Sequence, residues 1–228
     1  ENPESKNPSD RQRWDMRYRE GAYAQRHWPN AYLQQLHQDG VIPGDGRALD
    51  MACGRGRNSL FLASYGLAVD AVDVSPVAIA QGANTAIAGH MRVNWQCSDV
   101  LKLGCSLPLN TYALAVMIRF VAPTLLPRLL HALVPRGILV LEEHLQWDGA
   151  ERVSGPDSNR FRVASGDLSR QLHESQVSFD VLHQYEGLIS EPADDGTEIN
   201  AAVARMCIRR SSTSVSYTHL RAHETSAN

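Results

Sequence analysis

Short apolar runs alternate with helical spacing of apolar residues through the middle of the chain. The runs that predict strands are residues 47–51, 68–72, 93–97, 113–118 and 138–141, and the segments that predict helices are 58–65, 76–88 and 125–133. Strands that alternate with helices form βαβ units, in which neighbouring strands are parallel. The run at 113–118 is apolar at every position, which predicts a strand buried on both faces. The pattern therefore predicts an α/β protein built on a parallel sheet.

The part of the chain after this alternation has a different pattern. Its predicted elements are a loop at 149–166, a short helix at 167–173 and strands at 177–187 and 201–209. The two strands flank the Asp-Asp-Gly sequence at 194–196, whose residue types favour a tight turn. We therefore expect a C-terminal antiparallel hairpin beside the parallel sheet.

The two ends of the chain are predicted to lie outside the folded domain. Residues 1–13 are polar and predicted to be flexible, and residues 211–228 show neither helical nor strand periodicity. The stretch 215–225 looks like the translated sequencing-adapter run found at the ends of some metagenomic reading frames. We expect this tail to be disordered and to carry no evolved function, which leaves one domain over residues 14–210.

The composition fits a single soluble globular domain whose partner is neither a nucleic acid nor a membrane. The chain has 228 residues, 22 basic and 25 acidic side chains and a formal charge of −3, which argues against a duplex-binding surface. No apolar run approaches the roughly 20 residues needed to cross a bilayer, and the first residues lack the layout of a signal peptide. The four cysteines are irregularly spaced and include no C-x-x-C pair, so we expect a cytoplasmic protein without a metal site.

The segment that points most directly to a ligand is the turn after the first predicted strand. Asp50 stands inside the strand end, and Gly54 and Gly56 let the backbone approach a ligand closely before a helix begins. Free amides at the helix N-terminus then face the carboxyl end of the strand, where α/β sheets bind nucleotides. A dinucleotide fingerprint would need glycine where Ser59 stands, so a nicotinamide-dependent dehydrogenase is the least favoured alternative.

Three acids end three successive predicted strands. Asp50 is placed for an ammonium group, Asp73 for the two hydroxyls of a ribose, and Asp99 follows the next strand. A ligand that meets all three needs a cationic end, a free diol and an exocyclic amine. S-adenosyl-L-methionine has these three groups, and we predict that it is the cofactor.

These segments carry a family resemblance. Residues 50–63 resemble motif I of class I S-adenosylmethionine-dependent methyltransferases, most closely the group that includes tellurite-resistance and thiopurine methyltransferases. Residues 71–76 look like motif II, residues 98–100 look like the adenine-contacting motif, and residues 14–21 are similar to the family's N-terminal helix. The resemblance covers residues 14–210. It implies a Rossmann-like, doubly wound, mostly parallel seven-stranded sheet with a C-terminal antiparallel hairpin and an N-terminal helical lid.

The resemblance also implies roles for individual residues. Asp50 and the turn would surround the methionyl part of the cofactor, Asp73 would bind the ribose and Asp99 the adenine amine. The implied cofactor-binding residues are Trp14, Asp50, Ala52, Cys53, Gly54, Gly56, Asp73, Val74, Asp99 and Val100. Trp14 shares a helical face with Tyr18, so it either covers the cofactor or only packs its helix. Ala52 departs from the family, since many members have glycine there.

The acceptor side of the site is less clearly marked. Methyl transfer is an in-line displacement, for which a protein supplies alignment, water exclusion and, where needed, a base. Arg119 follows the fourth predicted strand, and it either holds an anionic substrate or pairs with a local acid. His144 follows the fifth, and it is either a base or an ordinary surface or capping residue. Because Glu142 to His144 are consecutive in a strand, they do not converge on a metal ion.

We therefore predict a methyltransferase that acts on a small-molecule acceptor such as a thiol or a chalcogen oxyanion. Ala113 stands where the family commonly has an acid, and Arg136 interrupts a usual Pro-Gly-Gly turn. These two departures keep a second interpretation open, in which the chain is a non-catalytic, regulatory module that binds S-adenosylmethionine.

Overall fold

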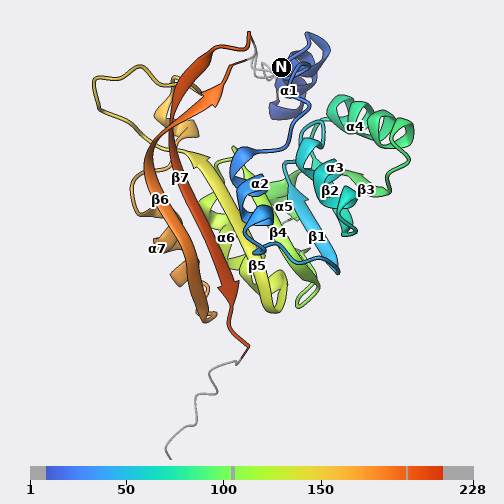
Figure 1. Cartoon of the computed structure of the whole chain (residues 1–228), viewed down its shortest axis with the longest axis vertical. Coiled ribbons are helices and arrows are strands. Elements are labelled where there is room, and N and C mark those ends of the chain that lie inside the picture. The colour runs from blue at the N-terminus through green and yellow to red at the C-terminus, as the bar shows by residue number, and fades with distance from the viewer. Residues whose placement is uncertain (1–8, 104–105, 194, 213–228) are drawn as a thin grey trace, which may run out of the picture.

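This computed structural model describes residues 9–103, 106–193 and 195–212. Its strands form one seven-stranded sheet. Its strands are β1 (Arg47–Met51), β2 (Ala68–Asp73), β3 (Val93–Cys97), β4 (Tyr112–Ile118), β5 (Leu133–His144), β6 (Phe179–Pro192) and β7 (Glu198–Arg210). Their order is β3-β2-β1-β4-β5-β7-β6. The strands β1 to β5 pair in parallel, whereas β7 is antiparallel to both β5 and β6 (Figure 1). The mostly parallel sheet and its antiparallel hairpin are confirmed.

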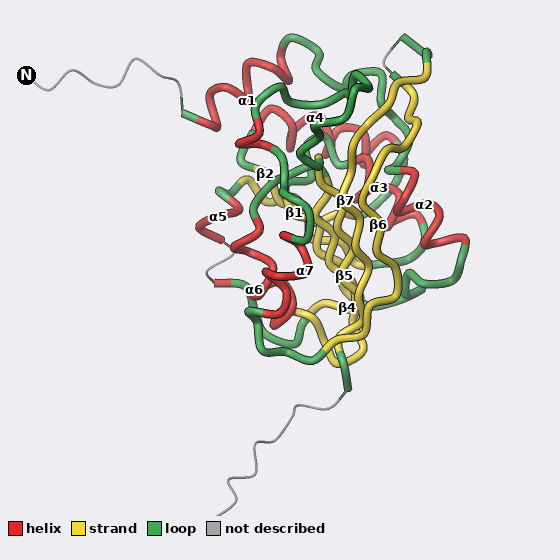
Figure 2. The backbone as a smooth tube through the Cα atoms, turned by 90° about the vertical axis from the view of Figure 1, so that its left-hand side faces the viewer, coloured by secondary structure: helices red, strands yellow, loops and turns green. Residues whose placement is uncertain are grey.

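Helices cover both faces of this sheet. They are α1 (Asp10–Arg19), α2 (Ala31–Gln38), α3 (Arg57–Ser64), α4 (Pro76–Ala88), α5 (Val100–Leu103), α6 (Leu126–Ala132) and α7 (Asp167–His173). Residues of α2 and α3 form a buried cluster with one face, and residues of α6 and α7 form a second cluster with the other. In Figure 2 the sheet accordingly lies between α6 and α7 on one side and α2 and α3 on the other.

The central strand β4 shows why an unbroken apolar run is required here. Leu114 and Val116 pack in the cluster with α2 and α3, while Ala115 and Met117 pack in the cluster with α6 and α7. Successive side chains of a strand point to opposite faces, so a strand covered on both sides needs apolar residues at every position. The parallel register then brings the carboxyl ends of β1, β2 and β4 to one edge of the sheet, where ligands bind in such folds.

Several boundaries differ from those predicted, among them the end of β6 at Pro192 rather than at residue 187, and two have a physical reason in the structure. The strand β5 begins at Leu133 rather than at residue 138, because Leu133 pairs with Tyr112 across an irregularity and the chain continues through Arg136 at φ +66°. The helix α1 begins at Asp10, before the predicted domain start at residue 14, because Ser9 and Gln12 form a capping box.

Parts of the predicted ends lie outside the described residues, namely 1–8 at the start and the tail from residue 213 on. Residue 194 of the predicted hairpin turn also lies outside them. Among the described helices, none combines the length and the apolar character that a membrane span requires.

Candidate functional site

The turn between β1 and α3 has the left-handed backbone that its glycines predict. Ala52, Gly54 and Gly56 have φ values of +58°, +56° and +76°. The Cys53 amide donates to the Val72 carbonyl at 2.9 Å, and the Gly56 amide donates to the Cys53 carbonyl at 2.9 Å. These bonds hold the turn against the end of β2, so the backbone from Ala52 to Gly56 lies at the carboxyl edge of the sheet.

Asp50 lies buried beneath this turn, with 2% of its surface exposed. Its Oδ2 accepts a hydrogen bond of 2.6 Å from the Ser59 hydroxyl on α3. Burial raises the pKa of Asp50 to about 7, although the Ser59 hydrogen bond works in the opposite direction. The serine that breaks the dinucleotide fingerprint is therefore the partner of the first acid.

Asp73, at the end of β2, joins two loops. Its Oδ2 accepts from the Gly54 amide at 2.8 Å and its Oδ1 accepts from the Ser75 amide at 2.9 Å. Burial raises the pKa of Asp73, while these amides lower it. A carboxylate has about four acceptor positions, so two positions remain for a ligand.

The helix α1 packs against this site through two residues, Asp15 and Tyr18. The Ser75 hydroxyl donates to Asp15 Oδ1 at 2.5 Å and accepts from the Ala78 amide, which caps α4. The Tyr18 hydroxyl lies 2.7 Å from the place that a Cβ on Gly54 would occupy. Trp14 instead makes ring contacts with Tyr18 at 5.9 Å and with Arg17 at 5.0 Å. The sequence pointed to Trp14 and missed Asp15.

The residues predicted to bind the adenine lie in a part of the site that is more exposed to solvent than Asp50 and Asp73 are. Asp99 caps α5 by accepting from the Leu101 amide at 3.0 Å, and 41% of its side chain is exposed. Val74 is half-buried, whereas Val100 packs inside the cluster with α6 and α7. The adenine-binding roles of these three residues stay predictions.

Arg119 lies just after β4 and is held by ion pairs. Its Nε donates to Glu142 at 2.8 Å, its Nη2 donates to Glu191 at 2.8 Å, and its Nη1 donates to His144 Nδ1 at 3.1 Å. All three guanidinium nitrogens therefore have partners within the chain. Of the two roles considered from the sequence, the structure contains the ion pair with local acids.

Glu142 is the centre of this network and is fully buried. It also accepts from Arg205 Nε at 2.7 Å and from the Asn30 side-chain amide at 2.7 Å. Burial alone raises the pKa of Glu142, but Arg119 and Arg205 more than offset it and hold the pKa below the ordinary value. The carboxylate is thus charged and fully engaged.

His144 is packed beneath the loop that follows β5. A Cβ on Gly155 would lie 2.4 Å from its ring, and Arg162 ties the loop down by donating to the carbonyls of Leu145, Ser154 and Pro156. Burial, then Arg119 and Arg162, lower the pKa of His144 to about 3. A neutral imidazole with so low a pKa is a weak base near pH 7.

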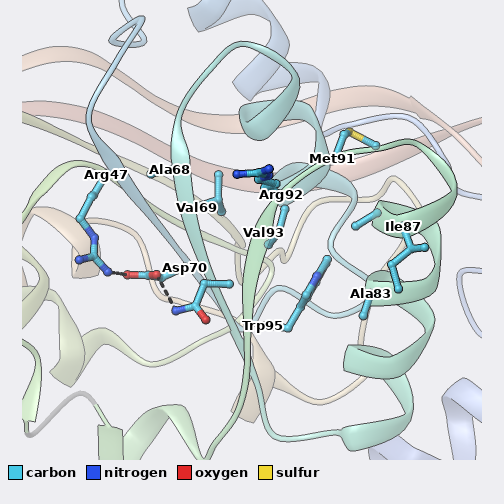
Figure 3. A pocket seen from close by; sticks show the side chains of 12 residues that line it. Arg47, Ala68, Val69, Asp70, Ala83, Ile87, Met91, Arg92, Val93 and Trp95 are labelled. Atoms are coloured by element: carbon cyan, nitrogen blue, oxygen red, sulfur yellow. Dashed lines mark hydrogen bonds and ion pairs between the residues drawn. The ribbon is translucent and has the colours of Figure 1, made fainter.

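A separate hollow of about 570 Å³ lies between β2, β3 and α4 (Figure 3). Val69, Val93 and Trp95 line it, and the ion pair between Arg47 and Asp70 lies at its margin. Arg47 and Val93 begin their strands, so this hollow lies towards the amino ends of β1 and β3, and the Trp95 ring reaches from it to Gly56 of the glycine turn. Within the described part of the chain, no three His, Cys, Asp or Glu side chains gather in the way that metal ligands would.

A family model matches the part of the chain that contains the glycine turn and Asp73. Residues 48–137, which include the glycine turn and Asp73, match the family model described as a methyltransferase domain. The search of curated proteins found no match.

Several solved structures share the fold. One of them was solved in work on the conversion of a disulfide bond into a thioacetal group during echinomycin biosynthesis. It is 19% identical to this chain, has a TM-score of 0.67, and the match covers 91% of this chain and 94% of that chain. TehB from Haemophilus influenzae is 19% identical, with a TM-score of 0.63 and coverage of 86% and 67%. A SAM-dependent methyltransferase from Methanosarcina mazei is 17% identical, with a TM-score of 0.56 and coverage of 81% and 99%.

At these identities the solved structures establish the fold, and the family match covers residues 48–137. This segment is similar to a methyltransferase domain, and the Methanosarcina mazei structure that shares the fold is described as a SAM-dependent methyltransferase.

Proposed function

We propose that this chain transfers a methyl group from S-adenosylmethionine to a small-molecule acceptor. The observation that carries the proposal is the left-handed turn from Ala52 to Gly56, joined to Asp73 by the Gly54 amide. The turn brings backbone without bulky side chains to the sheet edge, and Asp73 stands beside it with free acceptor positions. When bound, S-adenosylmethionine supplies an electrophilic methyl group.

The residues at this edge fit the cofactor's polar groups. Asp50 is buried and makes no ion pair with another described residue, and its pKa of about 7 leaves it ready to ionise beside an ammonium group. Asp73 would accept from the ribose hydroxyls, and Asp99 from the adenine amine. Tyr18 covers Gly54 from α1 and would exclude water from the methionyl part.

The acceptor is proposed to be a small nucleophile, with a thiol or a chalcogen oxyanion as the first compounds to test. The resemblance to tellurite-resistance and thiopurine methyltransferases supports this choice. TehB is among the structural neighbours, and another neighbour is described with chemistry at a disulfide.

Calorimetry with S-adenosylmethionine and its demethylated product tests the cofactor assignment. Asp73→Ala is expected to weaken binding by about 2–4 kcal/mol, because charge-assisted hydrogen bonds are lost. Asp70→Ala is the matched control, since Asp70 lies on the same strand but bonds to Arg47, Asn94 and Tyr112. Failure of the wild-type protein to bind either ligand would contradict the proposal.

Transfer of a labelled methyl group to a panel of small thiols and oxyanions tests catalysis. Labelled product rejects the non-catalytic regulatory module. Preferential thermal stabilisation by NAD would instead favour the dehydrogenase alternative.

A further inference from the structure

A buried carboxyl group, Glu143, has no role in the site as described above. Glu143 is fully buried, and neither of its oxygens has a hydrogen-bond partner among the described residues. Buried polar side chains are nearly always hydrogen-bonded, so an orphaned carboxyl points to a missing ligand or proton-transfer partner. The two neighbouring residues, Glu142 and His144, are both engaged with Arg119.

We propose that Glu143 takes the proton of the methyl acceptor, which is therefore a neutral nucleophile that loses an O–H, S–H or N–H proton. This inference rests on the proposed function and deepens it by assigning the acceptor class.

The register places Glu143 level with the glycine turn. Met51 pairs with Met117, and Met117 pairs with Leu141, so these three residues form one row across β1, β4 and β5. Glu143 lies two residues beyond Leu141 and returns to the face that packs with α6 and α7, and the turn residue Ala52 packs against the same cluster. Two strand spacings, about 10 Å, separate the ends of β1 and β5 across β4, a distance that a glutamate side chain and a small acceptor would span together.

The surroundings of Glu143 on this face are apolar. Leu141 and Leu145, its same-face neighbours along the chain, are buried in the cluster with α6 and α7, and Phe120 packs against that cluster. On the adjoining strand β7 its partner is Ala204. The site therefore excludes water, which strengthens any charge interaction within it.

Two charged groups and one amide act on Glu143. Burial raises its pKa well above the ordinary value, Glu142 raises it further, and Arg119 lowers it. The Phe120 amide also lowers the pKa, although its geometry does not complete a hydrogen bond. The net effect favours the neutral form of the carboxyl, which agrees with the absence of a hydrogen-bond partner among the described residues.

A sulfonium cation nearby would favour the ionised carboxylate. During transfer the acceptor's X–H bond breaks, its electron pair forms the bond from X to the methyl carbon, and its proton goes to Glu143. The electron pair of the broken carbon–sulfur bond stays on sulfur. A cation and an anion are thereby replaced by two neutral groups, which suits a pocket that excludes water.

The other candidate bases are occupied or unsuited. Asp50 is bonded to Ser59, and His144 has a pKa of about 3. A second orphaned group supports a polar ligand on this face, since Trp147 packs against the same cluster and its Nε1 is buried without a partner among the described residues. That indole donor suits a lone pair of the acceptor.

Proton linkage tests the proposal without knowledge of the acceptor. Calorimetric titrations near pH 7, in buffers of different ionisation enthalpy, report the protons released as each ligand binds. S-adenosylmethionine and S-adenosylhomocysteine share the ammonium group that would face Asp50 and differ in the charge on sulfur. We expect the first ligand to release up to about one proton more than the second, because only it promotes ionisation of Glu143.

Glu143→Gln is expected to abolish that difference and to change the affinity for S-adenosylhomocysteine by less than about threefold, since glutamine resembles the protonated acid. Asp50→Asn is the control: it should reduce proton release for both ligands equally and leave the difference intact. Equal proton release in the wild type, or a difference that persists in Glu143→Gln, would overturn the assignment. Failure to bind either ligand would instead refute the proposed function itself.

Discussion

Gly54 is the residue at which the glycine turn and the N-terminal helix meet. Its φ of +56° is costly for any other residue, and an added Cβ would lie 2.7 Å from the Tyr18 hydroxyl. We expect Gly54→Ala to lower the free energy of unfolding by about 2–4 kcal/mol, from backbone strain and from overlap. Urea unfolding measures this loss.

Gly40 provides the control for the Gly54 prediction. It has a φ of +71°, but no atom lies within 4 Å of an added Cβ. Gly40→Ala should therefore cost only about 1 kcal/mol of backbone strain. Equal losses in the two variants would show that Tyr18 does not press on the turn.

His144 should make stability depend on pH. Its pKa is about 3 in the folded chain, against an ordinary value of 6.5, so protons bind more tightly to the unfolded state. Its contribution to stability is full above pH 6.5 and is lost as the pH falls towards 3, by about 1.4 kcal/mol per pH unit. At pH 5 the loss is about 2 kcal/mol.

His144→Gln removes this titration and leaves an acceptor for Arg119. Urea unfolding at pH 7, 6 and 5 should therefore show a smaller loss of stability on acidification in the variant than in the wild type. Asp50 and Glu143, whose pKa values are raised, have the opposite dependence in both proteins, so their effects cancel in the comparison. Parallel pH curves for the two proteins would refute the buried, neutral state of His144.

At the scale of elements, the buried side chain of Asp15 ties α1 to the start of α4. Asp15 accepts from the Ser75 hydroxyl, which also caps α4, so the two helices share one anchor. Asp15→Ala is expected to speed amide exchange across residues 10–19 by about 5- to 30-fold, as one or two kcal/mol of local stability is lost. Hydrogen exchange with mass spectrometry measures it.

Asp10→Ala is the matched change on the same helix. Asp10 is exposed, and its ion pair with a described residue is a local one with Arg13. It should change exchange far less than Asp15→Ala does, because exposed pairs contribute little. Similar exchange in the two variants would mean that α1 is not anchored through Ser75.

The local pattern along the chain predicted most elements and the positions of the acids at strand ends. The run 47–51 is the observed β1, and 76–88 is the observed α4. The start of β5 was missed because Pro135, Arg136 and Gly137 are typical of a turn, whereas Leu133 before them pairs with Tyr112 and Ile138 after them pairs with Leu114. Cross-strand pairing is a long-range effect that a local pattern does not contain.

Within the site, the acids followed from strand ends, but their partners did not. Asp15 meets Ser75 across 60 residues, and Arg119 meets Glu191 across 72. Such pairings depend on how elements pack, and a single sequence gives no local signal for them. Glu143 had a usable signal, because residues of a strand alternate in direction and Glu143 must therefore face away from Glu142 and His144.

At the scale of the whole molecule, the fold determines that a ligand binds at the carboxyl edge of the sheet, and the residues at that edge determine which acceptor can bind. Folds of this class serve many reactions, and function resides in the site built on them. Here one face of the carboxyl edge carries the charged network around Glu142, and the other carries the orphaned Glu143. We therefore expect the two faces to differ in role: Glu142 stabilises the fold on one face, and Glu143 is the residue that we propose for chemistry on the other.

Glu142 joins distant parts of the chain, since its partners Asn30, Arg119 and Arg205 come from the segment before α2, the end of β4 and β7. Removal of one partner from a buried charge network leaves uncompensated charge, which costs about 3–5 kcal/mol. Glu142→Gln should lower the free energy of unfolding by that amount, as measured in urea. Glu191→Gln is the control, because Glu191 pairs with the same arginine but is 21% exposed, and about 1 kcal/mol is expected. If the two variants lost equal stability, the ion pairs of Glu142 would contribute no more than an exposed ion pair does. The contacts of Glu142 would then not hold the N-terminal and C-terminal parts of the sheet together.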